Sequence, residues 1–290
     1  MKIGGVGASP ISAPVHSTRY LGAPMSRADY ERSSDANTEA WRLMLTGDHP
    51  QMKSGRRFWS HVPARERCKM CNAPYTGVGG VVSQMRGRGP SNRHPRVCHA
   101  CETFSKGHPG GVELDISIVF VDVRNSTEMS DGLSPSEYAR TMNRFYTAAT
   151  NALTDADAII DKLVGDEVMA LFLPAFAGND HASKAVEGAL GIMERVGYGT
   201  SAGPFMDIGA GVNTGTAYVG VVGDQGNYRD FTALGEPVNL ASRLAQAAGS
   251  GEVLVSSMTT SAAHIEPHAV RDIHAKGFSG PIPVTVLTRP

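Results

Sequence analysis

Residues 113–172 switch between two kinds of periodicity, and this pattern constrains the fold more than any other feature of the chain. The first part, ELDISIVFVDV, alternates apolar and β-branched residues, which predicts a strand buried on at least one face. A helix follows, with Ser134 as its N-cap, a first-turn proline and Glu137 in the capping-box position. Two short apolar runs, 159–163 and 168–172, then flank Val-Gly-Asp-Glu and predict a β-hairpin.

Strands and helices continue to alternate along the rest of the chain. HASKAVEGALGIMERV has helical periodicity, and FMDIGAGVNTG and AYVGVV are expected to form another pair of strands. GEPVNLASRLAQAAGSG predicts a helix with an early proline and a glycine at its end, and EVLVSS and IPVTVLT predict further strands. The order β-α-β-β-α-β, with extra strands, predicts an α+β fold: a ferredoxin-like antiparallel sheet with helices on one face.

Composition divides the chain into three parts. Residues 1–35 are rich in Gly, Ser, Pro and Ala without periodicity, so we expect them to be disordered. Residues 36–106 contain every cysteine and are expected to form a small metal-binding and regulatory unit, the cysteine module. SKGHPGG reads as a linker, and residues 113–288 are expected to form the main domain.

The bulk composition argues against several classes of protein. The 290 residues are 41% hydrophobic and 19% charged, and 27 basic residues nearly balance 28 acidic ones. Net charge therefore gives no reason to expect a nucleic-acid partner. The chain has no apolar run of about 18 residues for a membrane span, and its start lacks the apolar core of a secretory signal. We expect a cytoplasmic protein with no membrane partner.

Two carboxylates stand out because they end apolar segments. Asp122 follows the strand SIVFV, and Asp166 lies in the turn of the hairpin. These elements are neighbours in the predicted sheet, so the side chains could converge and bind Mg²⁺, whose preferred ligands are hard oxygens. Taken singly, each is better explained as a turn-stabilising aspartate. Asn239 and Arg243, in VNLASR, lie four residues apart on one helix face, where they suit ribose and phosphate or form a solvated surface.

Four cysteines form two C-x-x-C pairs: Cys68 with Cys71, and Cys98 with Cys101. Four thiolates suit one tetrahedral Zn²⁺ with a structural role, which is the favoured interpretation. An iron–sulfur cluster and a reversible dithiol switch are the alternatives. The arginines between the two pairs are expected to form a solvated basic loop, because no aromatic residues are interleaved for base stacking.

The motifs together resemble one family. FVDVRNST, DKLVGDEVMALF, GVNTGTAYVGVVG and YRDFTALGEPVNLASRLAQAA occur in the order and at the separations of the class III adenylate and guanylate cyclase catalytic domain. The resemblance covers residues 113–288 and is closest to bacterial members that read the base with a Lys/Thr pair. It departs from many members at Arg124, Asn125 and Ser126, which is expected to alter either the surroundings of the triphosphate or the coupling to the N-terminal part.

The resemblance implies roles for individual residues. Asp122 and Asp166 would bind two Mg²⁺ or Mn²⁺ ions beside the Val123 carbonyl, and Lys162 and Thr232 would contact the base. The remaining matches are Asn239 for the ribose, Arg243 for the transition state and Lys276, in HAKGF, for a phosphate.

The resemblance also implies an assembly and a reaction. The family builds its sites between two domains arranged head to tail, and this chain has both sets of residues, so we expect a homodimer that binds a nucleoside triphosphate. The expected reaction converts ATP to 3′,5′-cyclic AMP and pyrophosphate. The alternatives are a cyclase that uses GTP or a pyrimidine triphosphate, and a silent nucleotide-binding sensor.

Overall fold

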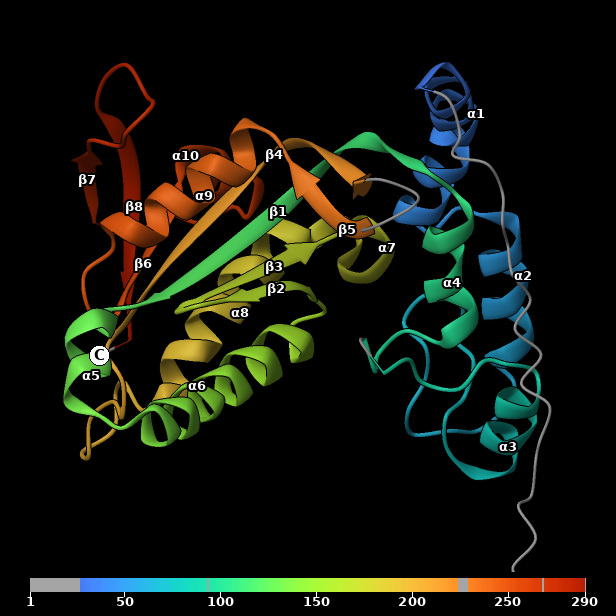
Figure 1. Ribbon diagram of the computed structural model, residues 1–290, viewed down its shortest axis with the longest axis horizontal. Coiled ribbons are helices and arrows are strands. Elements are labelled where there is room, and N and C mark those ends of the chain that lie inside the picture. The colour runs from blue at the N-terminus through green and yellow to red at the C-terminus, as the bar shows by residue number, and fades with distance from the viewer. Residues whose placement is uncertain (1–26, 93, 224–228, 268, 290) are drawn as a thin grey trace, which may run out of the picture.

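The computed structural model describes residues 27–92, 94–223, 229–267 and 269–289 and has one eight-stranded sheet at its centre (Figure 1). The strands are β1 (Gly110–Val123), β2 (Ile159–Val164), β3 (Glu167–Phe172), β4 (Ile208–Gly223), β5 (Arg229–Leu234), β6 (Glu252–Ser256), β7 (Val270–Ile273) and β8 (Ile282–Thr288). Their order is β2-β3-β1-β4-β6-β8-β7, with β5 paired to the end of β4. The antiparallel group β2-β3-β1-β4 confirms the ferredoxin-like core, whereas β4 and β6 are parallel.

The helices form two groups along the chain. Those of the N-terminal part are α1 (Arg27–Thr46), α2 (Pro50–Trp59), α3 (Gly77–Met85) and α4 (His99–Gly107). Those of the main domain are α5 (Ser126–Gly132), α6 (Pro135–Asp155), α7 (Pro174–Ala177), the 3₁₀ turn η1 (Gly178–Asp180), α8 (His181–Val196), α9 (Glu236–Ala247) and α10 (Ser257–Ala262). Among the described residues, no helix combines the length and apolarity that crossing a membrane requires.

Helices cover both faces of the sheet, so the expectation of helices on one face is wrong. Val119 and Val121 of β1 pack with α6 and α8 in one core cluster. Ile116 and Ile118, on the opposite face, pack in a second cluster with α9 and with Trp41 of α1. The physical reason is that β1 is apolar on both faces, so a single layer of helices would leave one face in water.

β4 is one continuous strand, although two strands were expected from its sequence. It pairs with β1 without a break from Ile208 to Val221. One of its glycines, Gly211, serves helix packing. A Cβ at Gly211 would lie 2.4 Å from the Ala241 carbonyl oxygen and 2.3 Å from the Ala245 nitrogen. The glycine therefore lets α9 approach the backbone of the sheet.

The predicted helix and hairpin after β1 are both present. α6 begins at a complete capping box, in which the Ser134 hydroxyl accepts from the Glu137 amide and the Glu137 carboxylate accepts from the Ser134 amide. β2 and β3 form the hairpin, but their pairing shifts between Ile160 and Lys162, so Asp161 is an extra residue in the edge strand. This bulge decides where the side chains of β2 point.

Order begins earlier in the chain than the composition indicated. α1 starts at Arg27, within the segment 1–35 that was expected to be disordered, and the rest of that segment lies outside the described residues. The C-terminal turns of α1 bury Trp41 and Leu45 against the sheet, and helix formation propagates cooperatively from such an anchored end. The expected boundary at 113 moves to Gly110, where β1 begins.

The cysteine module packs directly against the main domain (Figure 1). The Trp41 ring stacks on Phe231 of β5, with centroids 5.8 Å apart and planes 20° apart, and meets Phe104 of α4 edge-on at 5.3 Å. A second contact joins the two parts, in which the Arg56 guanidinium donates to the Ala175 carbonyl at 2.9 Å. The module therefore touches the main domain both at β5 and just beyond the β2–β3 hairpin.

A buried histidine makes the stability of the fold depend on pH. His181 is 8% exposed, its Nδ1 lies 2.9 Å from the Ser117 hydroxyl, and burial lowers the pKa of its imidazole, opposed weakly by Asp115 and Asp180. The unfolded chain therefore takes up a proton more readily, so stability is complete above about pH 6.5 and falls below it. Urea unfolding between pH 7.5 and 5 should show this slope reduced in His181→Gln, and an equal slope in both proteins would contradict the assignment.

Candidate active site

The two predicted metal aspartates come together where β1 ends and the hairpin turns. The Val123 amide donates to the Asp166 carbonyl at 3.2 Å, which fixes the turn against the end of β1. Asp122 lies opposite Glu167 in the register of β1 and β3, one position from Asp166. The Ser126 hydroxyl donates to Asp166 Oδ2 and holds that carboxylate in place. Adjacent carboxylates with an orienting hydroxyl provide the oxygen ligands that fit Mg²⁺ or Mn²⁺.

The half-buried Asp122 carboxylate needs a positive charge nearby to stay ionised. Burial raises the pKa of Asp122 to about 6, the Arg124 guanidinium opposes the rise, and the neighbouring Asp166 adds to it. Arg124 forms an ion pair with Asp122 and also donates to the Gln246 and Ala248 carbonyls, at 3.1 and 3.3 Å. A divalent cation beside both aspartates would relieve the repulsion between them.

The predicted base-reading pair is brought together by β2 and β5. Lys162 Nζ lies 3.3 Å from Asp230 Oδ2, and the Thr232 hydroxyl donates to Asp161 Oδ2 at 2.9 Å. Lys162 Nζ is also 3.8 Å from Asp161 Oδ2. Thr232, Asp161 and Asp230 are buried, whereas the Lys162 side chain is 37% exposed. Residues far apart in the sequence thus form one compact polar group with an accessible ammonium.

The residues predicted on α9 lie along its accessible side. Asn239 is exposed, and the Arg243 guanidinium donates to Gln246 Oε1 at 2.7 Å, a surface contact that a stronger anion could replace. The start of α9 is fixed because Asn213 donates to the Pro237 carbonyl at 2.9 Å. Lys276 is exposed in the loop between β7 and β8, and the structure does not bring it to either group of residues described above.

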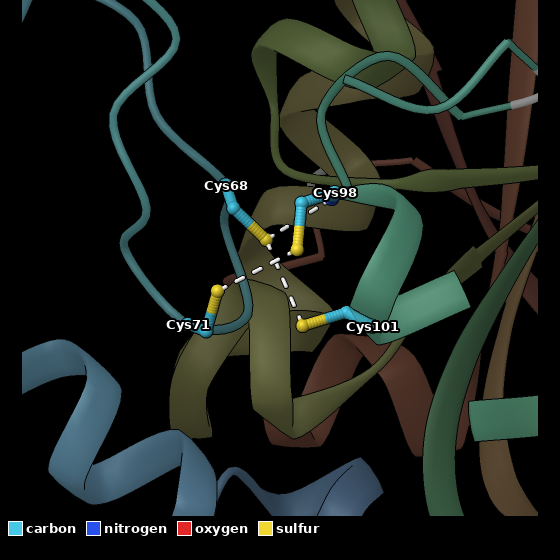
Figure 2. A group of neighbouring side chains, drawn as sticks. All are labelled: Cys68, Cys71, Cys98 and Cys101. Carbon is cyan, nitrogen blue, oxygen red and sulfur yellow. Dashed lines mark hydrogen bonds between the residues drawn. The ribbon is translucent and has the colours of Figure 1, made fainter. Parts of the chain in front are cut away.

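The four cysteines converge on one point, as Figure 2 shows. Cys98 and Cys101 come from the start of α4, and Cys68 and Cys71 come from the loop after α2. All four sulfurs lie within 4.8 Å of one another, with Cys68 and Cys101 at 4.0 Å and Cys71 and Cys98 at 3.6 Å. Four ligands at 2.3 Å from a tetrahedral ion would be about 3.8 Å apart. The spacing therefore fits a single metal ion.

Hydrogen bonds favour the thiolate form of two of the cysteines, Cys68 and Cys71. The Cys98 amide donates to the Cys68 sulfur at 3.2 Å, and the Arg88 guanidinium donates to the Cys71 sulfur at 3.4 Å. A hydrogen bond from Cys101 is the main cause that lowers the pKa of Cys68 to about 7. Arg96 pairs with Asp155 of α6 at 2.6 Å. These two arginines therefore have structural partners, which the interpretation of a solvated basic loop did not include.

Several residues of the site were not predicted from the sequence. Asp161 and Asp230 hold the base-reading pair, yet each reads as an ordinary polar residue of a strand. Their signal in the sequence is only that each lies within two positions of a predicted site residue. Ser126 was noted only as a departure from the family pattern, whereas the structure shows it in contact with Asp166.

Comparisons with known proteins agree with this geometry. The catalytic domain of adenylate and guanylate cyclases matches residues 112–285. An adenylate cyclase of Dictyostelium discoideum, termed terminal-differentiation specific, is 34% identical over 45% of this chain. An uncharacterised protein of Mycobacterium tuberculosis is 27% identical over 71% of the chain. The chain spans only 6% and 38% of the lengths of these two relatives.

Solved structures show the same relationship. The guanylyl cyclase Cya2 is 28% identical with a TM-score of 0.54, covering 61% of this chain and 93% of its own. The adenylyl cyclase CyaB from P. aeruginosa is 30% identical with a TM-score of 0.53, covering 60% and 94%. The residues that the family model matches include the paired aspartates, the polar group of β2 and β5 and the arginine of α9. This chain therefore belongs to the family of adenylate and guanylate cyclase catalytic domains.

Proposed function

We propose that the protein is an adenylate cyclase that converts ATP to 3′,5′-cyclic AMP and pyrophosphate. The observation that carries the choice of ATP is the meeting of Lys162 and Thr232 in one polar group between β2 and β5. The Lys162 ammonium can donate to the ring acceptor N1 of adenine, and a hydroxyl can accept from the exocyclic amine. Guanine presents an N–H and a carbonyl at those two positions.

The paired aspartates and α9 support the chemical step. Asp122 and Asp166, with the Val123 carbonyl, would hold two Mg²⁺ or Mn²⁺ ions, which lower the pKa of the ribose 3′-hydroxyl and bind the triphosphate. Asn239 would orient the ribose for in-line attack on the α-phosphorus. Arg243, released from its surface contact with Gln246, would stabilise charge on the phosphoryl oxygens as pyrophosphate leaves. Lys276 would bind a phosphate.

The working unit that we propose is a head-to-tail homodimer with two equivalent sites. Within one chain, the aspartates and the base-reading residues are held by separate sets of hydrogen bonds. The hairpin between them exposes Leu163 and Val164, at 45% and 59%, and Leu234 at the end of β5 is 49% exposed. A partner that covered these apolar side chains would complete each site with its own residues. We place this assembly in the cytoplasm.

Product analysis of the full-length protein tests the proposed reaction. Incubation with each ribonucleoside triphosphate and Mg²⁺ or Mn²⁺ is expected to give cyclic AMP from ATP as the main product. Lys162→Ala should lower kcat/KM for ATP about ten- to a hundredfold, because it removes a charged hydrogen bond. Lys184→Ala, which removes a lysine that pairs with Asp157, is the matched control and should keep the wild-type rate.

The outcomes separate the alternatives. A cyclic product made mainly from GTP or a pyrimidine triphosphate would correct the base. Tight ATP binding without any cyclic product would identify a nucleotide sensor instead of an enzyme.

We further propose that the four cysteines bind one structural Zn²⁺ that orders the module against the catalytic domain. Sulfur separations of 3.6 and 4.0 Å support a mononuclear site over an iron–sulfur cluster, because a cluster places its irons and sulfides between the thiolates. Two chain segments meet at these thiolates, so the ion would link them and add to the small hydrophobic core that includes Met52, Trp59 and Met70.

Metal removal should therefore unfold the module. We expect one zinc per chain by elemental analysis and a colourless protein. Cys98→Ser should lose the metal and expose the module to proteolysis, since structural zinc contributes on the order of 10 kcal/mol to folding. Ser60→Ala, which removes an exposed hydroxyl of the same module, is the control. Iron with visible absorption, or a Cys98→Ser protein that resists proteolysis as wild type does, would contradict the assignment.

A further inference from the structure

We propose that Asp161 is a positioning residue that makes the cyclase select a 6-amino purine, by holding the Thr232 hydroxyl as a hydrogen-bond acceptor toward the base. The proposal rests on the proposed function, because it concerns the same base site. It is carried by the bulge in β2, by the contact between Asp161 and Thr232, and by the chemistry of a hydroxyl that has a single proton.

The bulge places two consecutive side chains against the same strand. In a regular strand, Asp161 and Lys162 would point to opposite faces of the sheet. Here Ile160 lies opposite Ala170 and Lys162 lies opposite Met169, so Asp161 is the additional residue. As a result, Asp161 and Lys162 both reach β5, with contacts of 2.9 and 3.3 Å. Bulges near active sites commonly redirect side chains in this way.

The Thr232 hydroxyl donates its only proton to the Asp161 carboxylate. Its oxygen lies 2.9 Å from Asp161 Oδ2 and 3.5 Å from the Ala233 carbonyl, so the carboxylate is the better acceptor. Thr232 is 2% exposed and Asp161 is 6% exposed, which shields this hydrogen bond from water. A hydroxyl has one proton and two lone pairs. The side of Thr232 that remains for a ligand therefore offers lone pairs only.

This arrangement distinguishes purines at position 6. The exocyclic amine of adenine donates to the Thr232 oxygen, and its N1 accepts from the Lys162 ammonium, which Asp230 holds at 3.3 Å. A 6-oxo purine would direct a carbonyl oxygen at the Thr232 lone pairs and an N–H at the ammonium. Neither contact is a hydrogen bond, and unmatched polar groups in a buried site are costly. Threonine with a neighbouring carboxylate thus gains the acceptor character of an ionised aspartate.

Nucleotide binding to the full-length protein tests this inference separately from turnover. The probes are 3′-deoxy-ATP and 3′-deoxy-ITP, which cannot cyclise and which differ in the edge that Thr232 and Lys162 contact. In Asp161→Asn, the amide can donate to the Thr232 oxygen and free the hydroxyl proton to turn toward the base. We expect the ratio of the two dissociation constants to shift about tenfold or more toward the 6-oxo nucleotide.

Two further variants keep the test decisive. Thr232→Ser retains the hydroxyl and should retain the wild-type ratio. Thr232→Val should keep only the part of the discrimination that Lys162 provides, and adding Asp161→Asn to it should change the ratio no further. A ratio within twofold of wild type in Asp161→Asn would overturn the inference. If Asp161→Asn does not fold, a wild-type ratio in Thr232→Val would overturn it instead. Absence of cyclic AMP from wild-type protein would overturn the proposed function alone, because these binding ratios do not depend on turnover.

Discussion

Asp166→Asn is expected to lower kcat for cyclic AMP formation by at least about a thousandfold, because it removes charge from the site where metal ions would bind. Asparagine can still accept the hydrogen bond from Ser126, so the turn between β2 and β3 should keep its geometry. The measurement is the initial rate with ATP and Mn²⁺, with a thermal unfolding curve for each protein.

A graded control accompanies this variant. Ser126→Ala leaves the carboxylate in place and removes only the hydroxyl that orients it, so its rate should fall about ten- to a hundredfold, less than in Asp166→Asn. If Asp166→Asn kept its rate within tenfold of wild type, Asp166 would not be a metal ligand.

Arg243→Ala is expected to lower kcat about a hundred- to a thousandfold while leaving ATP binding nearly unchanged, because the guanidinium acts on charge that develops in the transition state. Its present contact, with Gln246 at the surface, contributes little to stability. Arg195→Ala, which removes an exposed arginine paired with Asp155, is the matched control and should keep the wild-type rate.

Mixing the two inactive variants tests the assembly. If each site takes its aspartates from one chain and its arginine from the other, an Asp166→Asn chain paired with an Arg243→Ala chain has one intact site. Random pairing in equal amounts makes half of the dimers mixed, so about a quarter of the wild-type activity should return. A mixture no more active than its separate components would rule out sites shared in this way.

Local sequence signals predicted the parts of the fold that local chemistry determines. The capping box at Ser134 and Glu137 marks the start of α6, and the polar turn at Asp166 marks the hairpin, because each needs only residues close in sequence. The continuity of β4 was not predicted, because it depends on pairing from Ile208 to Val221 with β1, which lies far away in the sequence. Only the packed structure shows that pairing.

The partners of the base-reading residues were beyond sequence reasoning for a similar reason. The contact between Asp161 and Thr232 joins residues 71 positions apart and depends on a bulge that no residue type announces. Strict alternation along β2 would place Asp161 and Lys162 on opposite faces of the sheet. The sequence therefore indicated candidates for contact with the base but not which side chains hold those candidates.

The stacking of Trp41 on Phe231 gives the protein an intrinsic optical probe. The chain has two tryptophans, Trp41 and Trp59, both buried in the residues that precede β1. Trp41 touches β5 one residue from Thr232, at a centroid distance of 5.8 Å from Phe231. Tryptophan emission therefore comes entirely from outside the catalytic domain, yet its wavelength depends on whether Trp41 stays sheltered against that domain. Undocking of the module would be visible as a red shift without any added label.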